Sequence, residues 1–492
     1  VYNPFQNTFW TIVLGEKFLI LTKMSAFIFV ITIIGFSNAA FGQSANVQTK
    51  QYENGGFYTG TFKNGRQHGY GTYSLPSGYQ YEGEWENGQA VGEGVAKFSN
   101  SSVYTGTFLN GKPNGIGTII YADGSKYTGV WVEAQIDGEG IAEYPDGTLY
   151  EGEFRANKYH GQGVLVLKSG YRYEGAWVNG VKEGVGTVTY ADGAIYSGGL
   201  IADKRSGKGS LTTANGIILL GEWLDGDFNG KGTVTQPNGD IYNGDIANGL
   251  EEGEGKLNYS NGDIYNGQFL AGLRHGYGEL IGNDNYHFVG DWFEGQMQGA
   301  GVETYSDGSV YTGEFVANLA DGKGEIIYAN GATYIGRWKS GEVDGKGIST
   351  YPNGMIYDGN FENGKIHGFG LMTFGDSYLY EGMWEDGERH GVGKVKYRDG
   401  TTYEGEFKAG QRSGKGVMQM KDGFEYSGQW LSGEMHGTGI AKYANGDVYD
   451  GNFFAGRRQG QGSMTYYTGV VQGGTWTEGA LDPDKSLSLI HI

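Results

Sequence analysis

The chain has 492 residues, of which 94 are glycine and none is cysteine, and its formal net charge is −20. The lack of cysteine excludes a disulfide framework and metal sites built on thiolates, and it leaves the redox compartment open. The negative charge opposes binding to nucleic acid and to anionic lipid head groups, because its long-range field repels both.

The first 57 residues precede the regular part of the chain. Residues 1–23 begin with Val1 and form no recognisable element, so we interpret them as an over-extended translation start before Met24. Residues 24–42 have the pattern of a secretory signal peptide, with the apolar run Ala26–Phe36 and small residues near Ala40. We expect export to the periplasm, the cell surface or the medium, with a retained N-terminal membrane anchor as the alternative. Residues 43–57 are polar, and we expect them to form a leader into the first repeat.

From residue 58 the chain repeats a 23-residue unit without insertion, which overrides any estimate of domain number from length. Positions are given below as offsets from the first residue of each unit, which is offset 0. Glycine concentrates at offsets 2, 7, 11, 13 and 20, which hold 85 of the 94 glycines. A half-repeat cap is expected at residues 472–480 and an irregular tail at 481–492. The eighteen units of residues 58–471 begin at Tyr58, Tyr81, Tyr104, Tyr127, Tyr150, Tyr173, Tyr196, Leu219, Tyr242, Tyr265, Phe288, Tyr311, Tyr334, Tyr357, Tyr380, Tyr403, Tyr426 and Tyr449.

The amino-acid sequence of the unit resembles the MORN repeat. The resemblance rests on Y-E-G-E-W at Tyr81–Trp85 and H-G-V-G at His390–Gly393, and it extends from residue 58 to about residue 479. It implies a string of β-hairpins in one elongated sheet, in scaffold proteins or beside membranes, sometimes fused to a lipid kinase or a methyltransferase. The chain outside the repeats is too short for either catalytic domain, so we expect no enzyme activity, no cofactor and no metal.

The sequence of each unit predicts two strands. In the unit that begins at Tyr403, aromatic side chains and glycine alternate with charged side chains, the period of two that separates the faces of a strand. Asp399-Gly400 and similar dipeptides between units predict tight two-residue turns, and a longer turn is expected within each unit. The predicted fold class is all-β, an elongated single-layer antiparallel β-meander or solenoid-like array of about 18 MORN-type β-hairpins.

Certain positions are expected to build this framework, and we assign them a structural role and no catalytic or binding role. In three representative units they are Tyr81, Gly83, Trp85, Gly92 and Gly94; Tyr380, Gly382, Trp384, Gly391 and Gly393; and Tyr403, Gly405, Phe407, Gly414 and Gly416.

Two of the repeat positions vary together. Offset 4 alternates between Trp and Phe over most of the chain, and offset 15 alternates in antiphase between small and large residues, with a shared fault near residues 240–285. The structural period is therefore 46 residues. We predict that the two positions pack together within one unit, with Trp384 beside Val395 and Phe407 beside Met418, so that the volume stays nearly constant.

Candidate chemistry is weak throughout. Six histidines share offset 10, but equivalent residues of adjacent units should lie about 10 Å apart, too far to share a metal ion. The Asp and Asn of the turns allow weak calcium binding, although turn geometry explains them better, and no phosphate-binding glycine loop is present. The histidines are His68, His160, His275, His367, His390 and His436.

Three functions remain. The first is a non-catalytic scaffold that presents its long face to a protein or cell-envelope partner. The second is a peripheral phospholipid-binding module, and the third is an accessory part of a phosphatidylinositol-phosphate kinase system; both follow from the resemblance alone. The sequence does not reveal whether the chain forms homo-oligomers.

Overall fold

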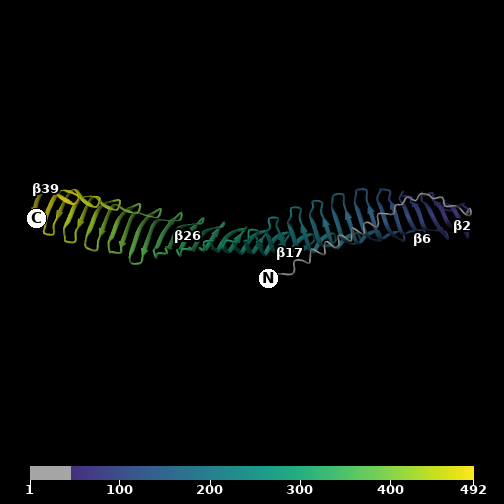
Figure 1. Cartoon of the computed structure of the whole chain (residues 1–492), viewed down its shortest axis with the longest axis horizontal. Coiled ribbons are helices and arrows are strands. Elements are labelled where there is room, and N and C mark those ends of the chain that lie inside the picture. The colour runs from purple at the N-terminus through teal and green to yellow at the C-terminus, as the bar shows by residue number, and fades with distance from the viewer. Residues whose placement is uncertain (1–45, 492) are drawn as a thin grey trace. The chain divides into compact units, whose positions relative to one another are not determined.

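The computed structural model describes residues 46–491, so the predicted start, signal peptide and first leader residues lie outside the described residues. Residues 46–491 contain no helix, and therefore none that could span a membrane. They divide into a smaller unit, up to Ala122 with Trp131–Ala134, and a larger unit, Asp123–Val130 with residues from Gln135 onward. Figure 1 shows the strands and turns following one another along the chain.

The smaller unit contains seven complete strands. They are β1 (Gln48–Gln51), β2 (Phe57–Lys63), β3 (Arg66–Ser74), β4 (Gln80–Glu86), β5 (Gln89–Lys97), β6 (Val103–Leu109) and β7 (Lys112–Ile120). Strand β8 (Lys126–Val132) is divided between the two units.

The larger unit contains the remaining strands. They are β9 (Gln135–Glu143), β10 (Leu149–Arg155), β11 (Lys158–Val166), β12 (Arg172–Val178), β13 (Val181–Thr189), β14 (Ile195–Ile201), β15 (Lys204–Thr212), β16 (Ile218–Leu224), β17 (Asp227–Thr235), β18 (Ile241–Ala247), β19 (Leu250–Asn258), β20 (Ile264–Leu270), β21 (Leu273–Ile281), β22 (His287–Phe293), β23 (Gln296–Thr304), β24 (Val310–Val316), β25 (Leu319–Ile327), β26 (Thr333–Lys339), β27 (Glu342–Thr350), β28 (Ile356–Glu362), β29 (Lys365–Phe374), β30 (Tyr378–Glu385), β31 (Glu388–Tyr397), β32 (Thr402–Lys408), β33 (Gln411–Gln419), β34 (Glu425–Leu431), β35 (Glu434–Lys442), β36 (Val448–Phe454), β37 (Arg457–Thr465), β38 (Val470–Thr477) and β39 (Ala480–His491).

Within the smaller unit, and likewise within the larger unit, every strand pairs antiparallel with the next strand of the chain. The smaller unit is a meander from β1 to β7, and the larger one continues in the same way, for example from β29 through β33. Each repeat supplies one hairpin of seven to ten residues per strand. The predicted all-β antiparallel meander of hairpins is confirmed.

The alternation along each strand separates two faces. In β32, Tyr403 and Phe407 are buried while Glu404 and Lys408 are exposed. The face that carries the aromatic residues of offsets 0 and 4 is called the inner face below, and the opposite face the outer face. Burial of large apolar side chains on one face only is the pattern expected for an antiparallel sheet with no second layer.

The predicted assignment of the turns is wrong. The two-residue turn with two positive φ values lies within each 23-residue repeat and joins its two strands. An example is Asp386 (φ 50°) and Gly387 (φ 85°), where Glu385 pairs with Glu388. Between repeats a single residue has positive φ, a glycine in most of these turns and Ser101 or Asn285 in two of them. An example is Gly400 (87°), whose N–H donates to Tyr397 O at 3.0 Å. Asn-Gly and Asp-Gly suit both places, because Asn and Asp tolerate a left-handed backbone and also accept hydrogen bonds in other turns.

The two ends of the described chain differ from expectation. Part of the predicted leader forms β1, which pairs with β2 from Gln48 to Gln51. The predicted irregular tail is instead strand β39, which pairs with β38 through two register shifts. The backbone of β38 leaves an open edge, and a following segment can pair with such an edge without matching the repeat.

Candidate functional site

A tyrosine lying over two glycines forms the centre of sixteen of the eighteen repeats. Gly382 and Gly393 face each other across β30 and β31, and a Cβ built on Gly393 would lie 2.5 Å from Tyr380 Oη. The hydroxyl donates to Met383 O at 2.8 Å. Both glycines are therefore required by the close approach of the ring, and burial raises the pKa of Tyr380 to about 12 even though the Arg389 charge lowers it.

The other predicted framework residues occupy the same geometry. Tyr81 covers Gly83 and Gly94 and donates to Glu84 O at 3.0 Å. Tyr403 covers Gly405 and Gly416 and donates to Glu406 O at 2.9 Å. The glycines at offset 11, Gly92, Gly391 and Gly414, have φ of 55°, 58° and 56° and lie where the strand pairing shifts register. Their left-handed backbone is the reason for glycine there.

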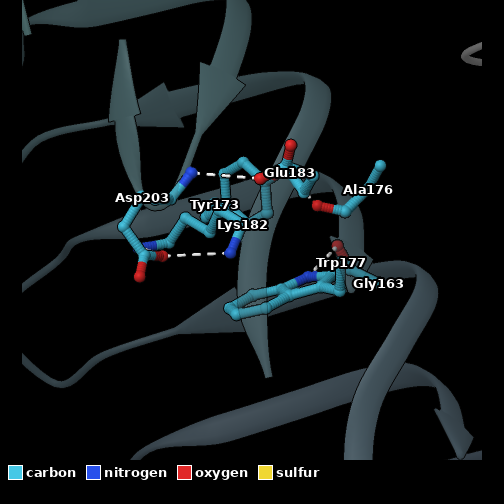
Figure 2. A network of polar contacts seen from close by, with 8 residues as sticks. Gly163, Tyr173, Ala176, Trp177, Lys182, Glu183 and Asp203 are labelled. Atoms are coloured by element: carbon cyan, nitrogen blue, oxygen red, sulfur yellow. Dashed lines mark hydrogen bonds and ion pairs between the residues drawn. The ribbon is translucent and has the colours of Figure 1, made fainter. Parts of the chain in front are cut away.

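The aromatic residue at offset 4 joins consecutive repeats. In Figure 2, Trp177 Nε1 donates to Gly163 O of the preceding repeat at 3.4 Å, while the Tyr173 hydroxyl donates to Ala176 O at 2.8 Å. Trp85 and Trp384 make the same bond to Gly71 and Gly370, at 3.1 and 3.4 Å.

The predicted pairing of Trp384 with Val395 is wrong. Val395 lies between Tyr380 and Tyr403 in the register, whereas Trp384 faces Arg389 within its own unit and lies 5.7 Å from the Tyr357 ring of the preceding one. Phe407 likewise contacts Tyr380 of the preceding unit, with ring centres 5.3 Å apart.

The antiphase series has its origin between units. Each tryptophan of the repeats follows a unit whose offset 15 is large, and the Tyr73 and Trp85 rings, 6.0 Å apart, show the contact directly. The nine pairs are Tyr73 and Trp85, Ile119 and Trp131, Leu165 and Trp177, Leu211 and Trp223, Leu280 and Trp292, Ile326 and Trp338, Met372 and Trp384, Met418 and Trp430, and Met464 and Trp476.

Arginines at offset 9 reinforce several of these junctions and were not anticipated. The Arg412 guanidinium lies 4.4 Å from the Trp430 ring centre and donates to Gly433 O at 2.8 Å. Equivalent arginines stack on the next tryptophan in three other units, at 4.1 to 4.4 Å. The sequence signal was an arginine two residues after the hairpin glycine in a unit that precedes a tryptophan unit.

Two repeats lack the tyrosine. Leu219 is too short to cover its glycine pair, and Phe228 from the second strand of the same unit fills the space, with its Cζ 2.5 Å from a Cβ built on Gly232. Phe288 covers Gly290 and Gly301 but has no hydroxyl to donate.

Among the described residues, one carboxylate of the inner face is buried. Glu303 at offset 15 is buried and accepts a hydrogen bond from the Tyr286 hydroxyl at 2.9 Å. Burial and the Glu303 charge together raise the pKa of Tyr286. The bond satisfies the buried carboxylate, which gives it a structural role.

The histidines of offset 10 lie near the hairpin turns. His367 and His390 pair with Glu362 and Glu385 of their own hairpins, at 3.3 and 2.8 Å. The His436 ring packs 5.1 Å from the Phe454 ring of the next unit. Within the described part of the chain, no three histidine or carboxylate side chains converge as metal ligands.

The side chains of the outer face differ from repeat to repeat. Short side chains above the glycines of β33 to β35 leave a shallow depression of about 460 Å³, lined by Gly416, Val417, Gly428, Gly439 and Ile440 among others. It holds no convergent set of charged groups, so it offers surface for contact and no arrangement for catalysis.

Comparisons with curated proteins and with solved structures give no match that supports an argument about this chain. No curated protein matches the chain in sequence. The Drosophila melanogaster SAS-4 TCP domain, solved with a proline-rich motif of Ana2, is 14% identical, with 43% of this chain and 99% of that one covered, at a TM-score of 0.18. The Danio rerio CPAP TCP10 domain with a STIL peptide is 13% identical, with 60% and 99% covered, at 0.15. A streptogramin B lyase is 16% identical, with 60% and 90% covered, at 0.11. Scores this low carry no argument about this chain.

The family comparison is decisive. The MORN repeat matches eighteen times in succession, from residues 58–78 to residues 449–471, in the register found from the sequence. Since these matches extend over most of the chain, the protein belongs to the MORN-repeat family.

Proposed function

We propose that this chain is a non-catalytic repeat scaffold that binds a protein partner at the cell envelope. The observation that supports this is the contrast between its two faces. On the inner face the large residues are used in packing repeat against repeat, whereas the outer face keeps one backbone pattern and varies its side chains. A regular backbone with variable side chains provides an extended binding surface in repeat proteins.

Export is part of the same proposal. Residues 24–42 have the composition of a signal peptide, and the absence of cysteine is compatible with an oxidising compartment. The net charge of −20 favours a protein partner over an anionic lipid surface.

A retention experiment tests the proposal. The full chain is immobilised and exposed to a solubilised envelope fraction and, separately, to protein-free vesicles of neutral and of acidic lipids, at low and high salt. We expect saturable, protease-sensitive retention from the envelope fraction, competed by free chain, and no retention of either vesicle. Retention of vesicles at the level of the envelope fraction, or insensitivity to protease, would replace the protein partner by phospholipid.

A further inference from the structure

An apolar stripe runs along the outer face of the larger unit. It consists of offsets 5 and 8, which flank the hairpin turn and pair with each other, as Leu270 pairs with Leu273 and Val316 with Leu319. Ile201, Leu224 and Phe293 are 58%, 63% and 52% exposed. The apolar stripe comprises Val178, Val181, Ile201, Leu224, Leu250, Leu270, Leu273, Phe293, Val316 and Leu319. Lys204, Asp227 and Gln296 interrupt it at offset 8, and the small, part-buried Ala247 interrupts it at offset 5.

The fold does not require apolar residues at these positions. The four units that follow have the same hairpins, but the eight equivalent positions are charged or polar. They are Lys339, Glu342, Glu362, Lys365, Glu385, Glu388, Lys408 and Gln411. Phe293 packs 5.2 Å from the His275 ring. Apolar residues that stay exposed over seven successive repeats, at positions where the fold accepts charged residues, mark an interaction surface.

The stripe is bordered by negative charge. The neighbouring outer-face positions, offsets 3 and 10, hold seven carboxylates and no Lys or Arg in these seven units. Three of them accept hydrogen bonds from the backbone of the next repeat: Glu183 from Ala202 N at 3.0 Å (Figure 2), Glu252 from Ala271 N at 3.1 Å and Asp321 from Ser340 N at 3.0 Å. Asp245 is neutralised by Lys231 at 2.6 Å. The acidic row comprises Glu183, Glu222, Asp245, Glu252, Asp291, Glu314 and Asp321.

The whole region shares this charge. Residues 173–333 contain 22 Asp and Glu against 8 Lys and Arg, a net charge of −14 out of the −20 of the full chain. The ligand that complements the surface is therefore apolar along one line and basic beside it.

The spacing of the stripe selects the shape of that ligand. Two strands per unit, at about 4.8 Å each, place equivalent residues about 10 Å apart. An α-helix rises about 10.5 Å in seven residues, so a helix laid across the strands presents one heptad to each unit. An extended segment gives no such match, since about three of its residues rise the same distance and its alternate side chains fall out of phase.

We propose that the apolar stripe and the acidic row bind an amphipathic helix of a partner protein, with apolar residues at heptad spacing and Lys or Arg along one flank. This rests on the proposed scaffold function and specifies the chemistry of its partner. Docking the apolar edge of the helix on the stripe removes both surfaces from water, and the basic flank sets its direction against the acidic row.

A designed peptide tests the proposal on the full chain. The probe has about 28 residues, or four heptads of about 42 Å in all, with Leu at the apolar positions and Lys on one flank. Controls are a scrambled peptide of the same composition and a peptide with Glu in place of Lys. We expect saturable binding of the probe alone, weakened at least tenfold in a Leu270→Glu, Phe293→Glu variant.

A matched variant separates the stripe from general charge effects. Leu431→Glu with Phe454→Glu changes two residues at the same offset outside the stripe, 53% and 60% exposed, and should leave binding unchanged. Glu222→Gln with Glu314→Gln should weaken it about threefold and reduce its salt dependence. Circular dichroism and thermal unfolding verify that each variant is folded.

Three results with the peptides and the purified chain would overturn the inference, and a fourth with the envelope fraction would do the same. These are equal binding of the scrambled peptide, equal loss in both Glu variants, and a concentration-dependent dimer that the Leu270→Glu, Phe293→Glu variant abolishes, which would assign the stripe to a second copy. The fourth result concerns the natural partner. If the Leu270→Glu, Phe293→Glu variant binds no peptide but still retains an envelope protein at the wild-type level, the partner does not use the stripe. The inference would then fall, and the proposed scaffold function would stand.

Discussion

Two stretches of the larger unit, residues 173–333 and residues 334–425, have the same hairpins but differ on both faces. The first includes Leu219 and Phe288 in place of tyrosine and carries the apolar stripe on its outer face. The second has tyrosine in every repeat and charged or polar residues at the positions equivalent to the stripe. The backbone pairing is alike in both, as at Gly221 with Gly232 and Gly382 with Gly393. The difference teaches that the glycine pair and its aromatic cover set the fold, while the outer face is free to specialise.

Alkaline pH should give the largest effect. Burial raises the pKa of Tyr334, Tyr380 and Tyr426 to about 12, from an ordinary value near 10. Because the folded state holds these protons more tightly, their contribution to stability is complete below pH 10 and is lost as the pH rises towards 12. We expect the denaturant midpoint to fall steeply over that window, together with the appearance of tyrosinate absorbance. Tyr357→Phe with Tyr380→Phe should move the loss to higher pH; an unmoved profile contradicts the assignment.

The aromatic cover can be broken in each stretch separately. Tyr380→Ala and Phe228→Ala should each lower the free energy of unfolding by about 3 to 5 kcal/mol, since each uncovers a glycine pair. Leu219→Tyr should restore much of the loss in the Phe228→Ala background, and overpack by about 1 to 3 kcal/mol on its own. Chemical denaturation measures all four variants. If Leu219→Tyr gives no rescue, Phe228 is not the substitute cover.

Coupling between repeats follows from the corrected packing. Met418→Val and Trp430→Phe should be coupled by about 0.5 to 3 kcal/mol, because the residues belong to one junction between units. The pair Trp384→Phe and Val395→Met should be coupled more weakly than this, because the two residues do not face each other and are linked only through Tyr380. A double-mutant cycle on each pair decides between packing across units and packing within one.

Local stability should differ between the stretches by a smaller amount. The repeats that begin at Leu219 and Phe288 lack the hydroxyl bond made by Tyr380, which contributes about 0.5 to 1.5 kcal/mol. Native-state hydrogen exchange should therefore show weaker protection in residues 196–310 than in 334–425. Equal protection would mean that the Phe228 cover compensates fully.

The outer face should show the smallest effect. Leu270→Glu and Glu385→Leu exchange the character of the two stretches at exposed positions, and each should change the free energy of unfolding by no more than about 0.5 kcal/mol. Thermal unfolding of both variants is the measurement, and a loss above about 2 kcal/mol would give the stripe a packing role.

The sequence predicts the repeat, the strands and the aromatic face because glycine spacing and period-two alternation each have one structural meaning here. It does not decide whether Trp384 packs within its unit or against the preceding one, because both arrangements give the same 46-residue alternation. The two kinds of turn could not be told apart for a similar reason. The Asp-Gly dipeptide occurs within a repeat, at Asp386-Gly387, and also between repeats, at Asp399-Gly400. The role of Phe228 was detectable only as an aromatic residue in the same unit as Leu219. The apolar stripe becomes visible once offsets 5 and 8 are known to pair.

The junction between tryptophan and a large residue of the preceding repeat also constrains how such a gene lengthens. Duplicating 46 residues copies a complete junction, whereas duplicating 23 residues places two large residues in successive repeats. That arrangement occurs at Leu257 and Leu280, where Phe269 follows the first and Trp292 the second. Insertion of a single repeat would produce this arrangement, whereas duplication in steps of 46 residues would preserve the regular alternation on either side of it.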